Sequence, residues 1–509
     1  LAHVASQYDF NYLYAERTNL VMPQGTDISN GVVNAPGDGY TDEDTTESYI
    51  ANFTLNYMEK YYLSGTFNRD GSSRFINDPW GNFYGLGASW IASKEDFFNT
   101  NTLNFLKIKA SYGVIGNAGG VGLYPGYNIY SINNLNDNIS LAFLTKGNKD
   151  LTWESSNQLN IGAEFEIANK LQGSLEFYHK TTTDMFFDRR VGPSVGYASI
   201  TVNDGELVNT GIEFDLNYDV FQNNDFSISL GVNGESFTNE LTAMPIDPAT
   251  GLEQNLDISG RYGRQKGKSL YDFYIPVYAG VNSASGAAQW ERFFDDINSN
   301  GVYDDDTDVI ITSLAQYTYD NKDATIVKDL TEVYADAADQ FTGHSAIPDL
   351  RGAFSFNASY GNFTLNALFN YQVGGHSYDF AYAALMDNDL LGSNNFHVDI
   401  RDRWTTPGDV TDIPRLDGRT QLQQNSSSTR FLTKADYIAL NNVRIGYDIP
   451  ENLLENTGVK SCNIYVSGDN LWLMSERKGF NPSNSVTGTS DWYRYNPLST
   501  IVFGLKLNL

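Results

Sequence analysis

One short stretch combines side chains that could bind a cation: "DINSNGVYDDDTD", residues 296–308. Oxygen-bearing side chains stand at alternate positions and a glycine follows at the sixth, which is the pattern of an EF-hand calcium loop. The ligands that this pattern predicts are Asp296, Asn298, Asn300, the Val302 carbonyl, Asp304 and Asp308. Thr307 stands at the twelfth position, where a carboxylate is expected, so Asp308 must close the site through a one-residue adjustment. The alternative is a solvated acidic turn.

The charge of this loop favours a divalent cation, because several carboxylates within thirteen residues repel one another. Calcium suits mixed side-chain and carbonyl oxygens better than magnesium does, since it accepts irregular sets of ligands. We expect calcium here to order the loop rather than to take part in a reaction.

Other arrangements that could carry out chemistry are missing from the sequence. The five histidines (His3, His179, His344, His376 and His397) have no zinc-binding spacing, and Cys462 stands without a nearby His or Asp pattern. The run "GVIGNAGG" at 113–120 resembles a phosphate loop, but no helical pattern follows it. The sequence therefore predicts that the protein is not an enzyme.

Aromatic residues in the expected outer loops could stack on sugar rings or on peptide side chains. These candidate ligand-binding residues are Tyr124, Tyr127, Trp290, Trp404, Trp492 and Tyr493. The alternative for each is packing against its own loop or against a partner.

Composition narrows the class of protein. The formal net charge of -29 argues against a nucleic-acid partner. A single cysteine excludes an internal disulfide framework. No apolar run approaches 18 residues, so we expect no transmembrane helix, and the first residues do not resemble a signal peptide.

Alternation with a period of two residues fills the chain and predicts an all-β fold. In "LNIGAEFEI", Leu159, Ile161 and Phe165 fall on one face, while Glu164 and Glu166 fall on the other. About thirteen such segments are visible, many of them near the ~10 residues that a tilted strand needs to cross a bilayer. They lie near 48–58, 60–70, 82–91, 103–113, 157–168, 171–181, 207–219, 225–238, 350–360, 362–373, 437–448, 461–470 and 499–509.

The connections between these segments alternate between tight turns and long loops, which is typical of a transmembrane antiparallel β-barrel of the outer membrane. A soluble β-sandwich would also alternate. Two features favour the barrel: tyrosines gather at the short-turn ends of strands, as an aromatic girdle would, and the chain stops inside a strand. The tyrosines are Tyr57, Tyr61, Tyr218, Tyr360 and Tyr447.

Seven runs resemble the C-terminal barrel region of the SusC/RagA family of TonB-dependent transporters, in the family's order and over almost the whole chain. They are "YYLSGTFNRDGSSRF", "LKIKASYGVIGN", "NKDLTWESSNQLNIGAEF", "LEFYHKTTTDMFF", "NTGIEFDLNYDV", "DRWTTPGD...IPRLDG" and "IYVSGDNLWLMSERKGFNPS". The resemblance implies a 22-stranded plugged barrel in the bacterial outer membrane. It also implies a SusD-like surface lipoprotein as partner and TonB-driven import of oligomers, glycans most often and oligopeptides next.

A complete member of that family begins with a TonB box, a plug domain and earlier strands, and none of these is visible here. We therefore expect residues 1–509 to be the C-terminal part of the barrel, spanning the lipid bilayer together with the remainder of the barrel and the plug. TonB would act through the missing N-terminal part. The rival interpretation is a secreted β-rich binding or adhesion protein without transport activity.

Strand parity predicts which connections are extracellular. It places the tight turns in the periplasm, and it places long extracellular loops at 240–348, including the strand-like 271–281, and at 374–436. The segment "NRDGSSRF" at 68–75 then becomes an extracellular hairpin. We expect its Arg69 and Arg74 to pair with acids at the barrel rim, with direct ligand contact as the alternative.

Overall fold

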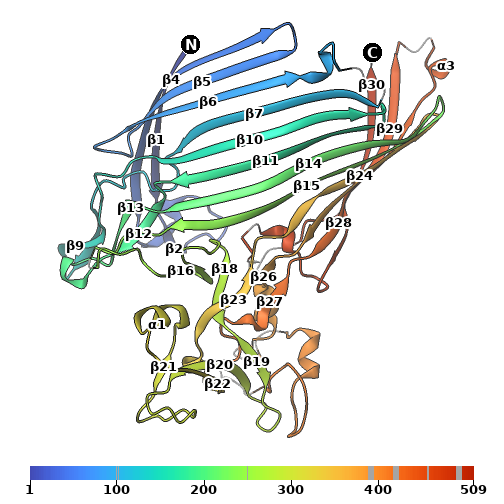
Figure 1. Cartoon of the computed structure of the whole chain (residues 1–509). Helices are drawn as coiled ribbons and strands as arrows, with labels where there is room; N and C mark the ends of the chain where they lie inside the picture. Colours follow the sequence, from blue (N-terminus) through green and yellow to red (C-terminus); the bar gives the residue numbers. More distant parts are fainter. Residues whose placement is uncertain are drawn as a thin grey trace.

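The computed structural model describes residues 1–98, 100, 102–248, 250–387, 392, 395–416, 423–455, 458–485, 487–488 and 496–508 (Figure 1). Its dominant feature is one 14-stranded sheet in which every neighbouring pair is antiparallel and the strands follow chain order. The strands are β1 (Ala2–Tyr14), β4 (Asp38–Tyr57), β5 (Tyr61–Ser72), β6 (Trp80–Ile91), β7 (Leu103–Asn117), β10 (Glu154–Ile167), β11 (Leu171–Thr183), β14 (Glu206–Gln222), β15 (Phe226–Ala243), β24 (Leu350–Tyr360), β25 (Phe363–Val373), β28 (Tyr437–Asp448), β29 (Ser461–Ser475) and β30 (Thr500–Asn508). Within the described residues, β1 and β30 each pair on one side only.

The sequence prediction of about thirteen strands missed the first strand, β1 (Ala2–Tyr14). Its alternation is broken at Ser6, although Tyr8, Phe10 and Tyr12 share a face. The second strand also begins ten residues before the predicted start, at Asp38 rather than near 48. The run "TDEDTTES" has no apolar face, so a two-residue period could not be recognised there.

The connections alternate in length along the sheet, so the short ones gather at one end and the long ones at the other (Figure 1). Turns at 58–60, 168–170, 223–225 and 361–362 join strand pairs, and 92–102 carries the 3-10 helix η2 (Ala92–Lys94). Met58 and Glu59 both adopt left-handed backbone angles, as tight hairpin turns require. The connection between β28 and β29 holds α3 (Glu451–Leu454).

The long connections form small sheets of their own. These are β2 (Arg17–Leu20) with β3 (Gly31–Asn34), β8 (Ile129–Leu135) with β9 (Asn138–Thr145), β12 (Phe186–Arg190) with β13 (Ser199–Asn203), and β26 (His376–Tyr378) with β27 (Leu432–Lys434). The connection 244–349 holds β16 (Asp257–Ser259), β17 (Tyr262–Arg264), β18 (Asp272–Pro276) and β23 (Asp339–Ser345) in one sheet. It also holds β19 (Tyr278–Val281), β20 (Ala288–Asp295), β21 (Val309–Ile311) and β22 (Ile326–Thr331) in another, with α1 (Leu314–Asp320). The connection 374–436 also contains α2 (Phe380–Leu385).

The segment 271–281, which resembles a spanning strand, lies outside the main sheet as β18 and β19. A buried core lies in this same region, where Phe273, Ile275, Tyr378 and Phe431 pack together. The two longest connections therefore share one hydrophobic core. No helix among the described residues is long and apolar enough to cross a membrane.

The main sheet has one apolar face and one polar face, as the alternation predicts. Glycines on the apolar face make room for large neighbours: a Cβ on Gly173 would lie 2.6 Å from Leu216 and 3.0 Å from Phe165. At the short-turn ends, aromatic rings meet across strands, with centroids 6.3 Å apart for Tyr57 and Tyr61. This is the arrangement of an aromatic girdle at a membrane interface.

Candidate functional site

The polar face of the sheet carries a row of charged side chains. Lys109 bonds Glu176 at 2.7 Å and Glu164 at 3.5 Å. Further along the sheet, Arg351 on β24 bonds Glu235 on the neighbouring strand β15 at 2.8 Å. A polar groove of about 600 Å³ runs along this face, lined by residues that include Glu176, Glu213, Asp215, Glu235 and Arg351. The predicted placement of Glu164 on the polar face is confirmed, and Glu213 and Asp215 lie on the same face.

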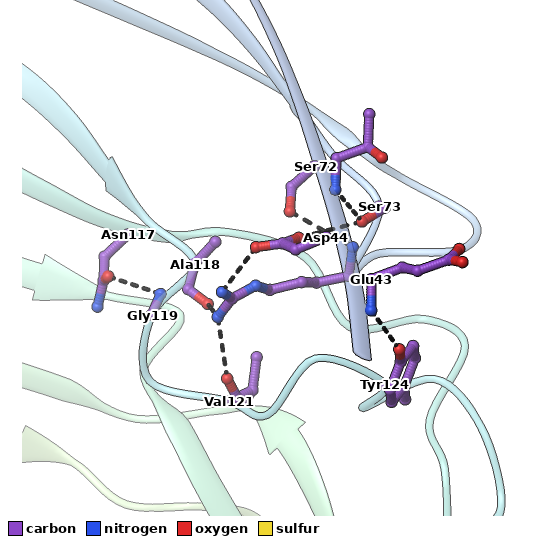
Figure 2. Close-up of polar contacts among 11 residues, drawn as sticks. Glu43, Asp44, Ser72, Ser73, Asn117, Ala118, Gly119, Val121 and Tyr124 are labelled. Atoms are coloured by element: carbon purple, nitrogen blue, oxygen red, sulfur yellow. Dashed lines mark hydrogen bonds and ion pairs between the residues drawn. The ribbon is translucent and has the colours of Figure 1, made fainter. Parts of the chain in front are cut away.

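Arg74 contacts two other segments at the long-connection end of the sheet, through Asp44 and through the carbonyls of Ala118 and Val121, the partners labelled in Figure 2. Its guanidinium bonds the carboxylate of Asp44 at 2.9 Å and donates to the carbonyls of Ala118 and Val121 at 3.1 and 3.2 Å. Asp44 also accepts a hydrogen bond from the Ser73 hydroxyl at 3.1 Å. The predicted pairing of Arg74 with an acid is confirmed, and the carbonyl contacts show that it also holds the start of the connection between β7 and β10.

Arg69 behaves differently from Arg74. Its guanidinium lies over the ring of Trp80, 5.4 Å from the centroid, and no acid among the described residues bonds to it. The prediction of an acid partner for Arg69 is therefore wrong. Arg69 and Tyr49 are cross-strand neighbours on β5 and β4, and the Tyr49 hydroxyl already donates to Glu47 at 2.7 Å.

Tyr124 lies beside this Arg74 cluster. Its hydroxyl accepts the backbone N–H of Glu43 at 2.8 Å, so it fixes the loop to β4 (Figure 2). The ring remains 36% exposed. It lines a pocket of about 540 Å³ between three connections, together with Ile129, Lys146, Phe186, Asp257 and Arg264.

The pocket mixes apolar walls with paired charges. Asp257 lies 3.5 Å from Arg264 and 3.7 Å from Arg190, while the hydroxyl of Thr201 donates to Asp188 at 2.7 Å. Such a combination could hold a polar oligomer through hydrogen bonds and ring contacts. Of these pocket residues, the sequence identified only Tyr124 as a candidate for ligand binding. The others could not be recognised, because segments far apart along the chain form the pocket.

The other candidate aromatics lie in several environments. Tyr127 is 55% exposed beside the pocket segment, whereas the Trp404 ring covers Gly286 and its indole donates to the Ser283 carbonyl at 2.9 Å. Trp290 is 0% exposed and packs edge-on against Tyr334. The prediction that Trp290 contacts the ligand directly is therefore wrong, because pairing of β20 with β19 and β22 buries its ring. Trp492 and Tyr493 lie outside the described residues.

In the candidate cation loop, residues 296–308, the carboxylates accept hydrogen bonds from the loop's own backbone. Asp296, which is 3% exposed, accepts the N–H groups of Asn300 and Gly301 at 3.1 and 2.7 Å. Asp308 accepts those of Ile297 and Asp304 at 3.2 and 2.9 Å.

The side-chain amides of Asn298 and Asn300 both donate to Asp304 at 2.7 Å. To bind a cation, each amide would turn by about 180° and present its oxygen. In the part of the chain that the structure describes, no three His, Cys, Asp or Glu side chains form a group that could hold a metal. The asparagine oxygens and the Val302 carbonyl would therefore have to complete the ligand set.

A stacked pair of histidines joins the two longest connections. The rings of His344 on β23 and His376 on β26 lie 4.0 Å apart at 30°. Burial, and then the nearby His344, lowers the pKa of His376 to about 4. On the same strand as His344, burial raises the pKa of Asp339 to about 6.

Comparison with protein families gives one match over half of the chain. The family model described as "TonB dependent receptor-like, beta-barrel" matches residues 3–268. TonB-dependent receptor P3 of Formosa agariphila is 28% identical over an alignment 513 residues long, which covers 94% of this chain and 47% of that protein. TonB-dependent receptor SusC of Bacteroides thetaiotaomicron is 26% identical over 489 residues, covering 92% of this chain and 44% of SusC. The chain thus spans about half the length of these relatives.

Solved structures show the same fold. A structure of the RagAB peptide importer in a "closed-closed" state matches with a TM-score of 0.79 and 24% identity, over 99% of this chain and 52% of that one. A second RagAB peptide transporter structure matches with a TM-score of 0.78 and 22% identity, over 99% of this chain and 55% of that one. At these identities the likeness establishes the fold alone.

Proposed function

Because the chain belongs to the TonB-dependent receptor-like β-barrel family, we propose that it forms part of a transporter that imports oligomeric nutrients across the bacterial outer membrane. The observation that carries this proposal is the 14-stranded antiparallel sheet with one apolar face, one charged face and connections that alternate in length. An apolar face suits lipid, while a charged face suits a polar lumen. We assign no chemical step to the protein.

The proposed partners follow from the relatives. SusC-like transport requires energy from TonB, which would act on a plug in the remainder of the polypeptide. A SusD-like surface lipoprotein would cover the long-connection end and contact the connections at 240–348 and 374–436. The shared core beneath these connections supports their acting as one unit.

The proposed substrate is an oligosaccharide or an oligopeptide. RagAB is a peptide importer, and SusC is a TonB-dependent receptor. The pocket at Tyr124 offers ring faces and paired charges, which both ligand classes can use. Binding should be measured by tryptophan fluorescence with matched sets of neutral glycans and of short peptides; only one set should saturate.

We also propose a structural calcium ion in the loop 296–308. Asp296, Asp304 and Asp308 would supply carboxylates once the loop rearranges around the ion, because they do not form such a group in the described structure. Asn298, Asn300 and the Val302 carbonyl would supply the remaining oxygens. The ion would order the connection 244–349 and would not enter the transport cycle.

Membrane extraction tests the transporter proposal against a secreted binding or adhesion protein. The transporter should sediment with outer membranes, require detergent, and migrate differently on gels before and after heating. A protein that stays in aqueous buffer with no heat-dependent mobility would refute the proposal.

A further inference from the structure

An open groove crosses the apolar face of the main sheet near its short-turn end. It has a volume of about 670 Å³ and lies over β4, β5, β6 and β7, the blue strands of Figure 1. The groove is deepest where Ala88 and Ala110 stand opposite each other in the register of β6 with β7. Larger side chains surround these two alanines on the same face: Leu55, Tyr57, Tyr61, Leu63, Trp90 and Ile108. The groove is therefore a hollow in an otherwise bulky apolar surface.

Two rings at the polar edge of this groove are held by Glu95, in the connection after β6. Its carboxylate accepts hydrogen bonds from the Tyr61 hydroxyl at 2.5 Å and from the Trp90 indole at 3.1 Å, and it pairs with the Lys60 ammonium at 3.0 Å. These donors, that of Tyr61 first, lower the pKa of Glu95 to about 2, so the carboxylate stays ionised at neutral pH. The rings are thus fixed in orientation, and the hollow is formed before a ligand enters it.

The position of the groove restricts its occupant. Tyr and Trp rings gather where the hydrocarbon of a membrane meets water, with their polar atoms toward the water. Further strands of a barrel would lie in the plane of the sheet, and a plug would lie on its polar face, so the remainder of the polypeptide would leave this hollow open. An empty hollow forfeits dispersion contacts along its lining. A flexible acyl chain of the membrane can enter it and restore them.

The polar edge of the groove also offers a cation to a lipid head group. Lys94 precedes Glu95, its side chain is 44% exposed, and its ammonium lies 3.3 Å from Glu59. An ammonium group has three N–H donors, so Lys94 can bond a phosphate and Glu59 together. Short turns of outer-membrane barrels face the periplasm, and the membrane leaflet on that side consists of phospholipid.

We propose that this groove binds one phospholipid, with an acyl chain over Ala88 and Ala110 and the phosphate at Lys94. The inference rests on the proposed function, because the groove meets lipid only if the sheet spans a membrane. A lipid bound there stays with the protein during purification, whereas the lipids around the rest of the barrel exchange with detergent.

Fluorescence quenching tests the binding in the full-length transporter. A phospholipid with brominated acyl chains is added to the protein in detergent, and the part of the quenching that is absent in Trp90→Phe reports on the groove. This quenching should saturate near one lipid for each transporter. Ala88→Leu with Ala110→Leu fills the hollow and should weaken binding at least about tenfold, because the acyl chain loses its buried contacts.

The matched control is Ala358→Leu with Ala367→Leu. These alanines lie on the apolar face of β24 and β25, where Ala358 is opposite Leu365 and Ala367 is opposite Phe356, and Ala358 is likewise near a short turn. The control should bind the lipid as the wild type does. Heat-dependent gel mobility should be unchanged in both double variants, which shows that they fold.

Native mass spectrometry provides the second measurement. The wild type should retain the mass of a phospholipid, and Lys94→Gln should retain less of it, whereas Lys170→Gln in the exposed turn after β10 should retain it fully. Quenching that rises in proportion to added lipid, equally in both double variants, would mean ordinary contact with the bilayer and would overturn the proposal. Retention of lipopolysaccharide in place of phospholipid would also overturn it, as would a loss of dimers in Ala88→Leu with Ala110→Leu, which would assign the hollow to a second copy of the chain. Each of these results leaves the transport proposal intact, whereas a protein that is soluble without detergent refutes both.

Discussion

Replacing Arg74 by Ala should release the start of the connection between β7 and β10 while leaving the main sheet intact. The guanidinium makes one ion pair, to Asp44, and two hydrogen bonds, to the carbonyls of Ala118 and Val121. Its side chain is 20% exposed and that of Asp44 is 16% exposed, so water replaces these contacts only in part. Residues 118–121 have no regular strand pairing to substitute for them.

The expected cost follows from these contacts. Hydrogen bonds to a charged group contribute about 1.5–3 kcal/mol each, but three that share one guanidinium are not additive. We expect a loss of about 2–4 kcal/mol in the stability of the closed loop, which raises its opening equilibrium about 30- to 1,000-fold. Arg74→Lys should lie between, because a single ammonium group cannot reproduce the planar fork of the guanidinium.

Hydrogen exchange followed by mass spectrometry in detergent measures this opening directly. Amides in 117–125 should exchange about 30- to 1,000-fold faster in Arg74→Ala, while those of β4 and β7 stay protected. Arg69→Ala is the matched control, since the one side-chain contact that Arg69 makes among the described residues is with Trp80, worth about 0.5–1 kcal/mol at an exposed site. If Arg74→Ala exchanges no faster in 117–125 than Arg69→Ala does, the guanidinium does not hold this loop.

Four further predictions concern the membrane face, two ionisable groups and the cation loop. Ile161→Arg, near the middle of β10, should destabilise the barrel by about 2–4 kcal/mol in urea unfolding in vesicles, whereas Asn160→Arg at the same depth on the polar face should have little effect. For His376, with a pKa lowered to about 4, the unfolded form binds more protons between about pH 4 and 6.5. Relative to His376→Phe, the wild type should therefore become easier to cleave within 374–436 as the pH falls through this range. The Asp339 carboxyl, with a pKa raised to about 6, has the opposite effect: relative to Asp339→Asn, the wild type should lose stability as the pH rises from about 4 through 6. A chelator should accelerate nicking of 296–308 in the wild type but not in Asp296→Ala; nicking that ignores the chelator in the wild type would argue against calcium.

The sequence predicts the sheet well wherever one face of a strand meets lipid, because burial on one face imposes a two-residue period. It predicts much less beyond the membrane. The upper part of β4 is polar on both faces, so pairing with β1 rather than side-chain pattern keeps it extended. Trp290 shows the same limit at a single residue: its neighbours in sequence are polar, and only the pairing of β20 with other strands buries it.

The connection between β7 and β10 brings three features of the outer surface into one segment. Its start is held by Arg74, its middle lines the pocket through Tyr124, and its far part forms the hairpin of β8 and β9. The base is therefore fixed to the sheet, while the hairpin is paired only with itself in the described structure. Loss of the Arg74 contacts should therefore free the residues that connect the sheet to the pocket, while the pairing of β8 with β9 persists.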